Sequence, residues 1–207
     1  MIEIFCSPIG LYGTNCYIIK DKATGLAAAA DCAVFDGDYE RLLRRADVGR
    51  LEFILLTHGH FDHICGVKAL KEKYGGIICI SEADAPCLTD EYKSYNAQMG
   101  YAPQEAVQAD RLLSDGDIIK LGETDIRVAA TPGHTAGSVC FMTEKEIFSG
   151  DTLFRLSVGR TDIGGDTLTL MRSLRRLSEI GGDRKVYPGH GEPTTMPYER
   201  RNNRFLV

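Results

Sequence analysis

All five histidines of this 207-residue chain stand in short segments rich in Gly, Asp and Thr. Three of them share the segment 57–63 (THGHFDH), and the other two, His134 and His190, each follow a Pro-Gly pair. Asp151 stands in a similar Ser-Gly-Asp segment. Histidine is the commonest side-chain ligand of protein-bound metals, and carboxylates share that role. The pattern therefore predicts a fold that gathers these side chains around metal ions.

The spacing within THGHFDH indicates two metal ions. In an extended segment that leaves a strand, alternate side chains point to the same side, so His58 and His60 can bind a first ion. Asp62 and His63, at the turn into a helix, can then reach a second ion.

The later motifs can complete both ions. His134 can add a third imidazole to the first ion, and His190 can complete the second. Asp151 is then expected to bridge the two ions.

Short apolar runs separated by turn residues predict the order of strands and helices. Strands are expected over residues 2–6, 15–20, 26–31, 51–56, 77–80, 118–121, 124–130, 139–143, 146–149 and 185–187, and helices over 35–48, 62–74 and 167–180. Asp166 is placed to cap the last helix. The segment 89–109 loses clear periodicity and is expected to cross the surface beside the site.

Two sets of strands, each accompanied by helices and followed by metal motifs, predict two sheets packed face to face with helices outside. The site should lie along one edge of this sandwich. The length suits one domain over residues 1–207, because no change of composition divides the chain.

Charge and hydropathy indicate the kind of partner. The formal net charge of -5 argues against an electrostatic hold on nucleic acid or anionic lipid, so a small-molecule substrate is expected. The sequence has no export signal and no run of roughly 18 apolar residues, which predicts a cytoplasmic protein that does not enter the membrane. The seven cysteines include no Cys-x-x-Cys pair and are expected to be reduced thiols, most of them in the core.

The ordered motifs resemble those of the metallo-β-lactamase superfamily, whose His-x-His-x-Asp-His motif is matched by His58, His60, Asp62 and His63. The segments 150–154 (GDTLF), 159–162 (GRTD), 164–166 (GGD) and 199–202 (ERRN) are similar to those of small, single-domain glyoxalase II-like hydrolases. The resemblance spans essentially the whole chain. It implies an α/β fold, the αββα sandwich, with two mixed sheets packed face to face and helices outside.

The resemblance also implies a ligand set. Its members are His58, His60 and His134 on metal one, Asp62, His63 and His190 on metal two, and Asp151 shared between them. Zinc is the expected ion at both positions, and iron or a mixture also suits histidine and carboxylate ligands.

This ligand set predicts hydrolysis. Two ions about 3.5–4 Å apart lower the pKa of a water held between them, direct the resulting hydroxide at a carbonyl, and stabilise the oxyanion. Asp62 is the expected catalytic residue, because it can fix the second ion, orient the hydroxide and hold a proton in transit. A thiolate leaves without a strong general acid, so an S-acyl thioester such as an S-2-hydroxyacyl glutathione is the expected substrate.

Alternatives remain open at this point. Another thiol or an ester is an alternative leaving group, because the chain ends at Val207 without the C-terminal helical region that helps full-length glyoxalase II enzymes hold glutathione. Persulfide dioxygenases of the same superfamily bind one iron, for which His58, His134 and Asp151 would serve here. Lactonases and β-lactamases would use the same bridging hydroxide.

Other residues stand near the motifs and have possible roles beside the ligands. Arg160 can reach a substrate carboxylate or pair with Asp162. Asp31 matches an aspartate that braces the metal loops in this superfamily. Cys32 and Cys65 stand close to site elements but are expected to be inert buried thiols. Tyrosines 92, 95 and 101 can line an entrance or pack on the surface.

Overall fold

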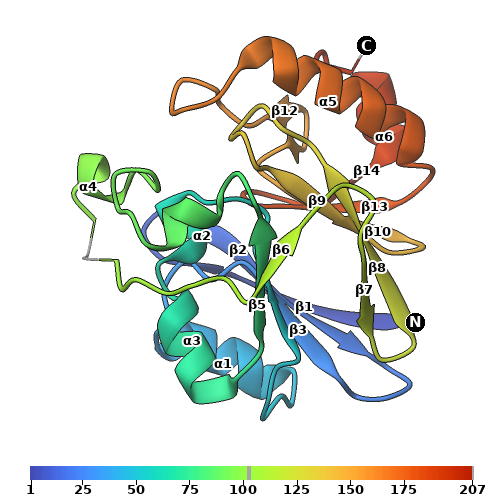
Figure 1. Cartoon of the computed structure of the whole chain (residues 1–207). Helices are drawn as coiled ribbons and strands as arrows, with labels where there is room; N and C mark the ends of the chain where they lie inside the picture. Colours follow the sequence, from blue (N-terminus) through green and yellow to red (C-terminus); the bar gives the residue numbers. More distant parts are fainter. Residues whose placement is uncertain (102–103, 207) are drawn as a thin grey trace.

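Two six-stranded sheets form the centre of the structure, a computed structural model that describes residues 1–101 and 104–206 (Figure 1). In the first sheet β1, β2 and β3 are antiparallel, and β3, β4, β5 and β6 run parallel. The sheet is therefore mixed. In spatial order its strands are β1 (Ile2–Ile9), β2 (Thr14–Asp21), β3 (Ala27–Ala30), β4 (Phe53–Leu55), β5 (Ile77–Ser81) and β6 (Arg111–Leu113).

The second sheet is also mixed, because β10 and β13 run parallel while its other neighbouring strands are antiparallel. A separate hairpin of β11 (Leu153–Phe154) and β12 (Ser157–Val158) follows β10. In spatial order the second sheet holds β14 (Thr194–Thr195), β13 (Lys185–Pro188), β10 (Glu146–Gly150), β9 (Val139–Met142), β8 (Thr124–Ala130) and β7 (Ile118–Leu121).

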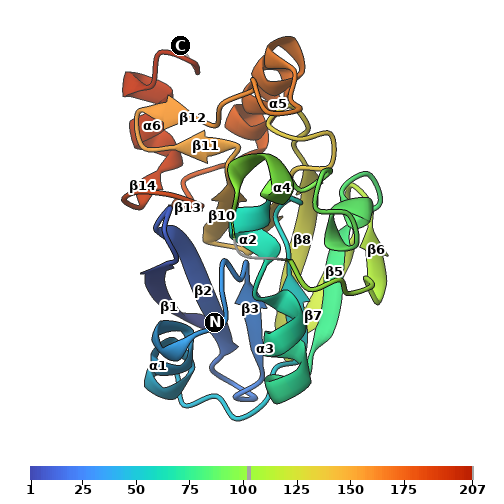
Figure 2. The same ribbon diagram turned by 90° about the vertical axis from the view of Figure 1, so that its left-hand side faces the viewer.

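Helices cover the outer faces of both sheets, as Figures 1 and 2 show. On the first sheet these are α1 (Gly37–Arg45) and α3 (Val67–Tyr74), and on the second sheet α5 (Thr167–Ile180) and α6 (Met196–Asn202). Three short helices occupy the connections that follow β4 and β5. They are α2 (Phe61–Ile64), the 3-10 helix η1 (Ala85–Leu88) and α4 (Asn96–Met99).

Strand alternation divides the core into three apolar layers. In β2, Tyr17 and Ile19 face the second sheet and pack in one cluster with Phe141, whereas Ile18 faces the helices with Leu42 of α1. Each such buried side chain stabilises the fold by about 1.5–3 kcal/mol. A third cluster lies between the second sheet and α5, α6. The predicted αββα sandwich is confirmed.

Several local predictions need correction. The helix expected over 62–74 is divided into α2 and α3, because the Gly66 N–H donates to the Cys32 carbonyl (3.0 Å) instead of continuing the helix. The strands β6, β11, β12 and β14 and the helix α6 were not predicted. Asp166 caps α5 as expected, accepting a hydrogen bond from Thr169 N. The segment predicted over 89–109 includes residues 102–103, which lie outside the described residues.

Asp21 ties the two sheets together at the end of β2 opposite Thr14. Its buried carboxylate accepts a hydrogen bond of 2.7 Å from Thr124 Oγ1 at the start of β8. Thr24 Oγ1 in the β2–β3 turn donates to the same carboxylate. One acidic side chain thus joins turns from both halves of the chain.

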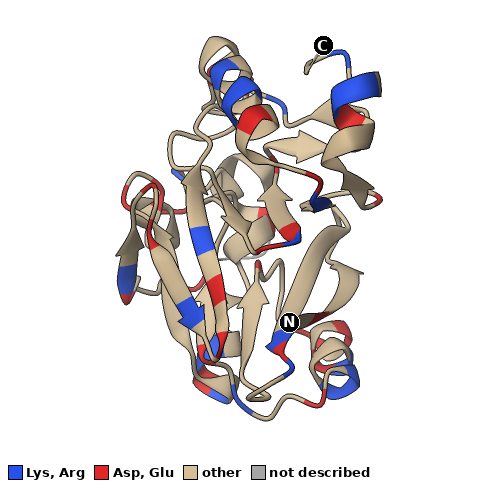
Figure 3. Ribbon diagram, turned by 90° about the vertical axis from the view of Figure 1, so that its right-hand side faces the viewer, with Lys and Arg blue, Asp and Glu red and all other residues tan. Residues whose placement is uncertain are grey.

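The described surface carries mixed charge. Figure 3 shows basic and acidic residues interspersed over the visible face, with both signs on several elements. Within residues 1–101 and 104–206, every helix is too short or too polar to cross a membrane.

Candidate metal centre

The structure brings all seven predicted ligand side chains together at one edge of the sandwich. Each is delivered by a loop or helix that follows a strand end. They are His58 and His60 after β4, Asp62 and His63 in α2, His134 after β8, Asp151 after β10, and His190 after β13.

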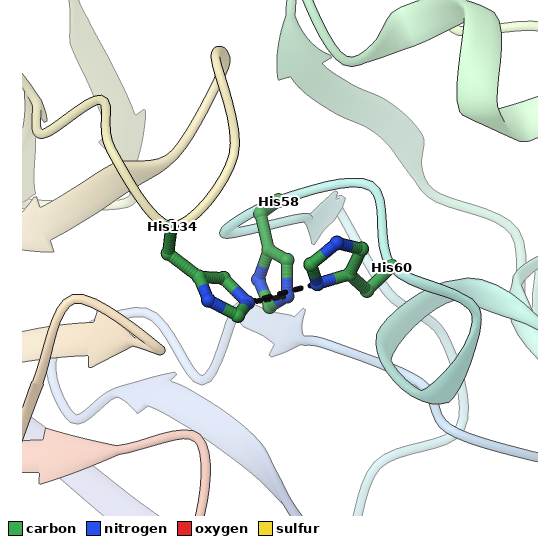
Figure 4. Close-up of side chains that lie close together, drawn as sticks. All are labelled: His58, His60 and His134. Atoms are coloured by element: carbon green, nitrogen blue, oxygen red, sulfur yellow. Dashed lines mark hydrogen bonds between the residues drawn. The ribbon is translucent and has the colours of Figure 1, made fainter. Parts of the chain in front are cut away.

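The first group consists of His58, His60 and His134, whose rings converge in Figure 4. His134 Nε2 lies 2.8 Å from His60 Nδ1 and 3.2 Å from His58 Nε2. All three side chains are buried. The inward nitrogens are therefore close enough to share one ion.

The outer nitrogens of this group determine which ring atoms carry hydrogen. His134 Nδ1 lies 2.7 Å from the Arg160 carbonyl, and His60 Nε2 lies 3.2 Å from the Ile163 carbonyl. A carbonyl oxygen can only accept, so both outer nitrogens are donors. Burial lowers the pKa of His60 and of His134 to about 4, which keeps the rings neutral. Their inward nitrogens consequently present lone pairs to the same point.

His58 is arranged in the same way. Its Nδ1 lies 3.1 Å from Thr57 Oγ1, and that hydroxyl donates to Asp31 Oδ2 at 2.8 Å. The hydroxyl oxygen is thus left to accept from His58 Nδ1, and His58 Nε2 carries the third inward lone pair. Converging lone pairs repel one another unless a cation lies between them.

The second group consists of Asp62, His63 and His190. His190 Nε2 lies 3.3 Å from Asp62 Oδ2 and 3.4 Å from His63 Nε2. On the outer side, His63 Nδ1 lies 2.8 Å from Asp31 Oδ2, and His190 Nδ1 lies 3.2 Å from the Tyr12 carbonyl. Both imidazoles therefore direct Nε2 inward.

Electrostatics in the second group also favour a cation. Burial by itself would lower the pKa of His63, but Asp62, Asp31 and Asp151 outweigh burial and raise the pKa to about 10. Burial would raise the pKa of Asp62, yet His63 and His190 hold it well below its usual value. The surplus of carboxylates is the kind of environment that binds divalent ions.

Asp151 lies between the two groups. Its Oδ2 is 3.5 Å from His134 Nε2 and 3.6 Å from His190 Nε2, and its Oδ1 is 3.4 Å from His63 Nε2. Within the described part of the chain, the buried Oδ1 has no hydrogen-bond partner. Burying a carboxylate oxygen without a hydrogen bond is costly, so it marks a position for a ligand.

Gly189 leaves room for this arrangement. A Cβ atom at residue 189 would stand 2.2 Å from Asp151 Oδ1 and 2.8 Å from His63 Cε1. Any larger residue would therefore displace the carboxylate from between the two groups. Taken with the converging lone pairs, the residues fit a pair of divalent cations.

Asp31 supports both groups from behind, as expected from the sequence. Besides His63, its carboxylate accepts hydrogen bonds from Thr57 N (2.9 Å) and Thr57 Oγ1. Asp31 has a φ of 58°, a left-handed conformation that Asp tolerates better than most residues.

A cavity of about 540 Å³ is lined by five of the seven side chains, all but His58 and His63. Of its other lining residues only Ser157 and Arg160 are strongly polar. Arg160 is paired with Asp162 at 2.6 Å, which confirms the second of its two interpretations. The remaining lining residues are Tyr12, Phe61, Met99, Phe154, Val158 and Ile163.

Sequence analysis missed two contributors to the site. Tyr12 lines the cavity and its carbonyl orients His190, but it stands in a turn between β1 and β2 that carries no metal motif. Asp84 follows β5 and contacts two ligand loops. The tyrosines named from the sequence differ in position. Tyr95 packs edge-on against His60 with ring centroids 5.6 Å apart, whereas Tyr92 is exposed on the surface.

The thiols near the site have raised pKa values. All seven cysteines are free, and burial together with Asp62 raises the pKa of Cys65 to about 12. Burial also raises the pKa of Cys32 well above its usual value. Cys32 is buried as expected, whereas Cys65 is half-buried.

Comparison with known proteins places this geometry in context. A family model described as the metallo-beta-lactamase superfamily matches residues 9–190. The chain is 34% identical to a protein of Haemophilus influenzae named hydroxyacylglutathione hydrolase GloC, over 99% of this chain and 97% of that protein.

Two solved structures have the same architecture over nearly the whole chain. One is BLEG-1 B3 metallo-beta-lactamase, with a TM-score of 0.89 and 32% identity over 99% of this chain and 100% of that chain. The other is TTHA1623 in a di-iron-bound form, with a TM-score of 0.85 and 33% identity over 98% and 100%.

Proposed function

Because the chain belongs to the metallo-beta-lactamase superfamily, we propose that it is a hydrolase that works with two divalent metal ions and cleaves a thioester. The observation that carries the proposal is the position of Asp151. Its carboxylate lies between two separate groups of ligands, and one of its oxygens is buried without a hydrogen bond among the described residues. This position suits a carboxylate that is shared by two ions.

We assign the ligands by these groups. His58, His60 and His134 would hold the first ion, and Asp62, His63 and His190 the second, with Asp151 shared. When bound, such a pair of ions lowers the pKa of a water and stabilises negative charge on a carbonyl oxygen. Zinc suits this set of ligands, and the di-iron form of TTHA1623 supports iron as an alternative.

Asp62 is the proposed catalytic residue among the ligands. It lines the cavity, and its Oδ2 accepts a hydrogen bond of 3.2 Å from Thr14 Oγ1. This contact and the neighbouring His190 fix the carboxylate in one orientation. From there Asp62 can hold a proton while the substrate bond is broken.

The apolar walls of the cavity support an acyl substrate. Phe61, Phe154 and Val158 can pack against an acyl chain and keep bulk water from the reacting carbonyl. A thioester suits this site, because a thiolate leaves without a strong general acid, and the described lining holds no carboxyl group or imidazole besides the ligands. The similarity to a hydroxyacylglutathione hydrolase supports the same substrate class.

The test is direct. Purified protein loaded with zinc or iron is expected to cleave S-D-lactoylglutathione with loss of the thioester absorbance, and a His58→Ala variant provides the background rate. If the wild-type rate equals the background for this compound and for a panel of other thioesters, thioester hydrolysis is wrong.

A persulfide dioxygenase with one iron is the alternative. Its ligands would be His58, His134 and Asp151, which also lie together here. The second group of Asp62, His63 and His190 would hold a second ion, which supports the two-metal hydrolase. One iron per chain with oxygen consumption on glutathione persulfide would favour the dioxygenase, and two metals without oxygen uptake would favour the hydrolase.

A further inference from the structure

Asp84 is a buried carboxylate that lies behind the first ligand group without belonging to it. It follows β5 at the start of η1, and its side chain is 3% exposed. In the described residues it forms no ion pair, and three hydrogen-bond donors surround it instead. Burying a carboxylate is costly unless it is hydrogen-bonded, so these three contacts hold Asp84 in place.

The three donors come from two different ligand loops. Asp84 Oδ2 accepts from Gly59 N at 2.8 Å and from Thr135 Oγ1 at 2.7 Å. Asp84 Oδ1 accepts from Gly137 N at 2.9 Å. Gly59 separates the ligands His58 and His60, and Thr135 follows the ligand His134 directly. Asp84 Oδ2 therefore connects the backbone of the first ligand loop to the Thr135 hydroxyl of the second, and Oδ1 holds the backbone of the second loop.

We propose that Asp84 is a positioning residue for the first metal ion: it fixes the 57–60 loop relative to the 134–138 loop, so that all three imidazoles meet at one point. The inference rests on the ligand assignment of the proposed function. It extends that assignment to a residue that contacts neither the ligands' rings nor the cavity.

The contacts around Asp84 are close enough to act in this way. A Cβ atom at residue 137 would stand 2.5 Å from Asp84 Oδ1, so glycine is what allows the loop to approach the carboxylate. Thr135 is held in turn, because its Oγ1 lies 2.7 Å from Ser138 Oγ and its N–H donates to the same Ser138 oxygen at 3.0 Å. The second loop is thus fixed at several points against one acidic side chain.

Removing this connection should affect the two ions unequally. Groups that orient metal ligands from behind typically change metal affinity by about 10–100-fold when they are lost. Asp84→Ala should lower the affinity for the first ion by this factor. The affinity for the second ion should stay near its wild-type value, because Asp31 and Tyr12 orient His63 and His190 independently.

The experiment is a cobalt titration of the full-length protein, with metal content measured after dialysis against a competing chelator. Asp84→Ala and Thr135→Val should retain about one Co²⁺ where the wild type retains two. The remaining visible spectrum should match that of His58→Ala, in which the first group is broken. Thr135→Ser keeps the hydroxyl and should retain both ions.

Asp21→Ala is the matched control. Asp21 is also buried and accepts similar hydrogen bonds. It lies at the end of β2, away from the ligand loops. This variant should lose thermal stability and still bind two ions. Thermal unfolding of every variant in chelator measures the purely structural effect, and Thr135→Val keeps the test valid if Asp84→Ala does not fold.

The outcomes separate the two proposals. If wild-type protein binds no second ion, the proposed function itself fails. If wild-type protein binds two ions and folded Asp84→Ala or Thr135→Val does the same with unchanged affinity, the positioning role is wrong. Equal weakening of both ions, or the same loss in Asp21→Ala, would also overturn it.

Discussion

His63 Nδ1 lies 2.8 Å from Asp31 Oδ2, and both side chains are fully enclosed by the protein. Asp31 thereby fixes which nitrogen of His63 faces the second ligand group. Because the same carboxylate accepts two hydrogen bonds from Thr57, it also sets the start of the loop that carries His58 and His60.

Asp31→Asn should weaken binding of the second ion by about 10–100-fold, since an amide cannot accept from His63 and from both Thr57 donors. Asp31→Ala should have the same effect and a further loss of about 1–2 kcal/mol of stability, because Ala is strained at a φ of 58°. Metal titration and urea unfolding measure the two effects. Unchanged metal affinity in a folded Asn variant would show that Asp31 does not orient His63.

Metal removal should destabilise the fold. A ligand that binds only the folded state at about 100 times its Kd adds about 2.7 kcal/mol to the free energy of unfolding. Chelator should therefore lower the thermal midpoint, and added zinc should restore it.

Asp151→Ala should reduce the stability that the fold gains from bound metal. Without metal, the variant should be close to the wild type in stability, because losing the ion pair with His63 is offset by no longer burying a carboxylate oxygen that lacks a hydrogen bond. With zinc, it should gain less stability than the wild type. Thermal scans of both proteins with and without metal test this, and a variant that gains as much stability from zinc as the wild type would contradict the assignment of Asp151 as a metal ligand.

The charge of the preferred substrate should depend on Asp162. Arg160 is the one basic residue among the described residues that line the cavity, and Asp162 pairs with it. Asp162→Asn should free the guanidinium and raise kcat/KM for a thioester with an anionic thiol by up to about fivefold, since an exposed ion pair contributes about 1 kcal/mol or less. A neutral thioester with the same acyl group is the control. An equal change for both substrates would mean that Arg160 does not meet the substrate's charge.

Stability at acidic pH should depend on Asp21. Burial would raise its pKa, but hydrogen bonds from Thr124 and Thr24 outweigh burial and lower the pKa from 3.8 to about 2. The ionised group therefore stabilises the fold above about pH 4, and this contribution is lost as the pH falls toward about 2. The stability gap between wild type and Asp21→Asn in urea unfolding should be constant near neutral pH and narrow below about pH 4. A gap that widens on acidification would contradict the lowered pKa.

The ligand motifs could be predicted from sequence because they are local. In THGHFDH the spacing itself separates His58 and His60 from Asp62 and His63, and the Pro-Gly pairs mark His134 and His190. The helix α5 could be predicted for the same reason, because its cap and its apolar face lie within one segment.

Contacts between distant segments could not be predicted in this way. Asp84 looks like any acidic turn residue until the fold places it between Gly59 and Thr135. The break between α2 and α3 could not be predicted either, because it depends on the hydrogen bond from the Gly66 N–H to the carbonyl of Cys32, which is distant in sequence. Very short strands such as β12 depend on a neighbouring strand and carry no pattern of their own.

The chain order of the two sheets has a practical consequence. All strands of the first sheet precede residue 114, and all strands of the second follow residue 117. His58, His60, Asp62 and His63 thus belong to one half, and His134, Asp151 and His190 to the other. Neither ligand group is complete in either half, so a chain severed at 114–117 could rebuild the site only by reassociation, and cobalt colour would then report that the fragments had rejoined.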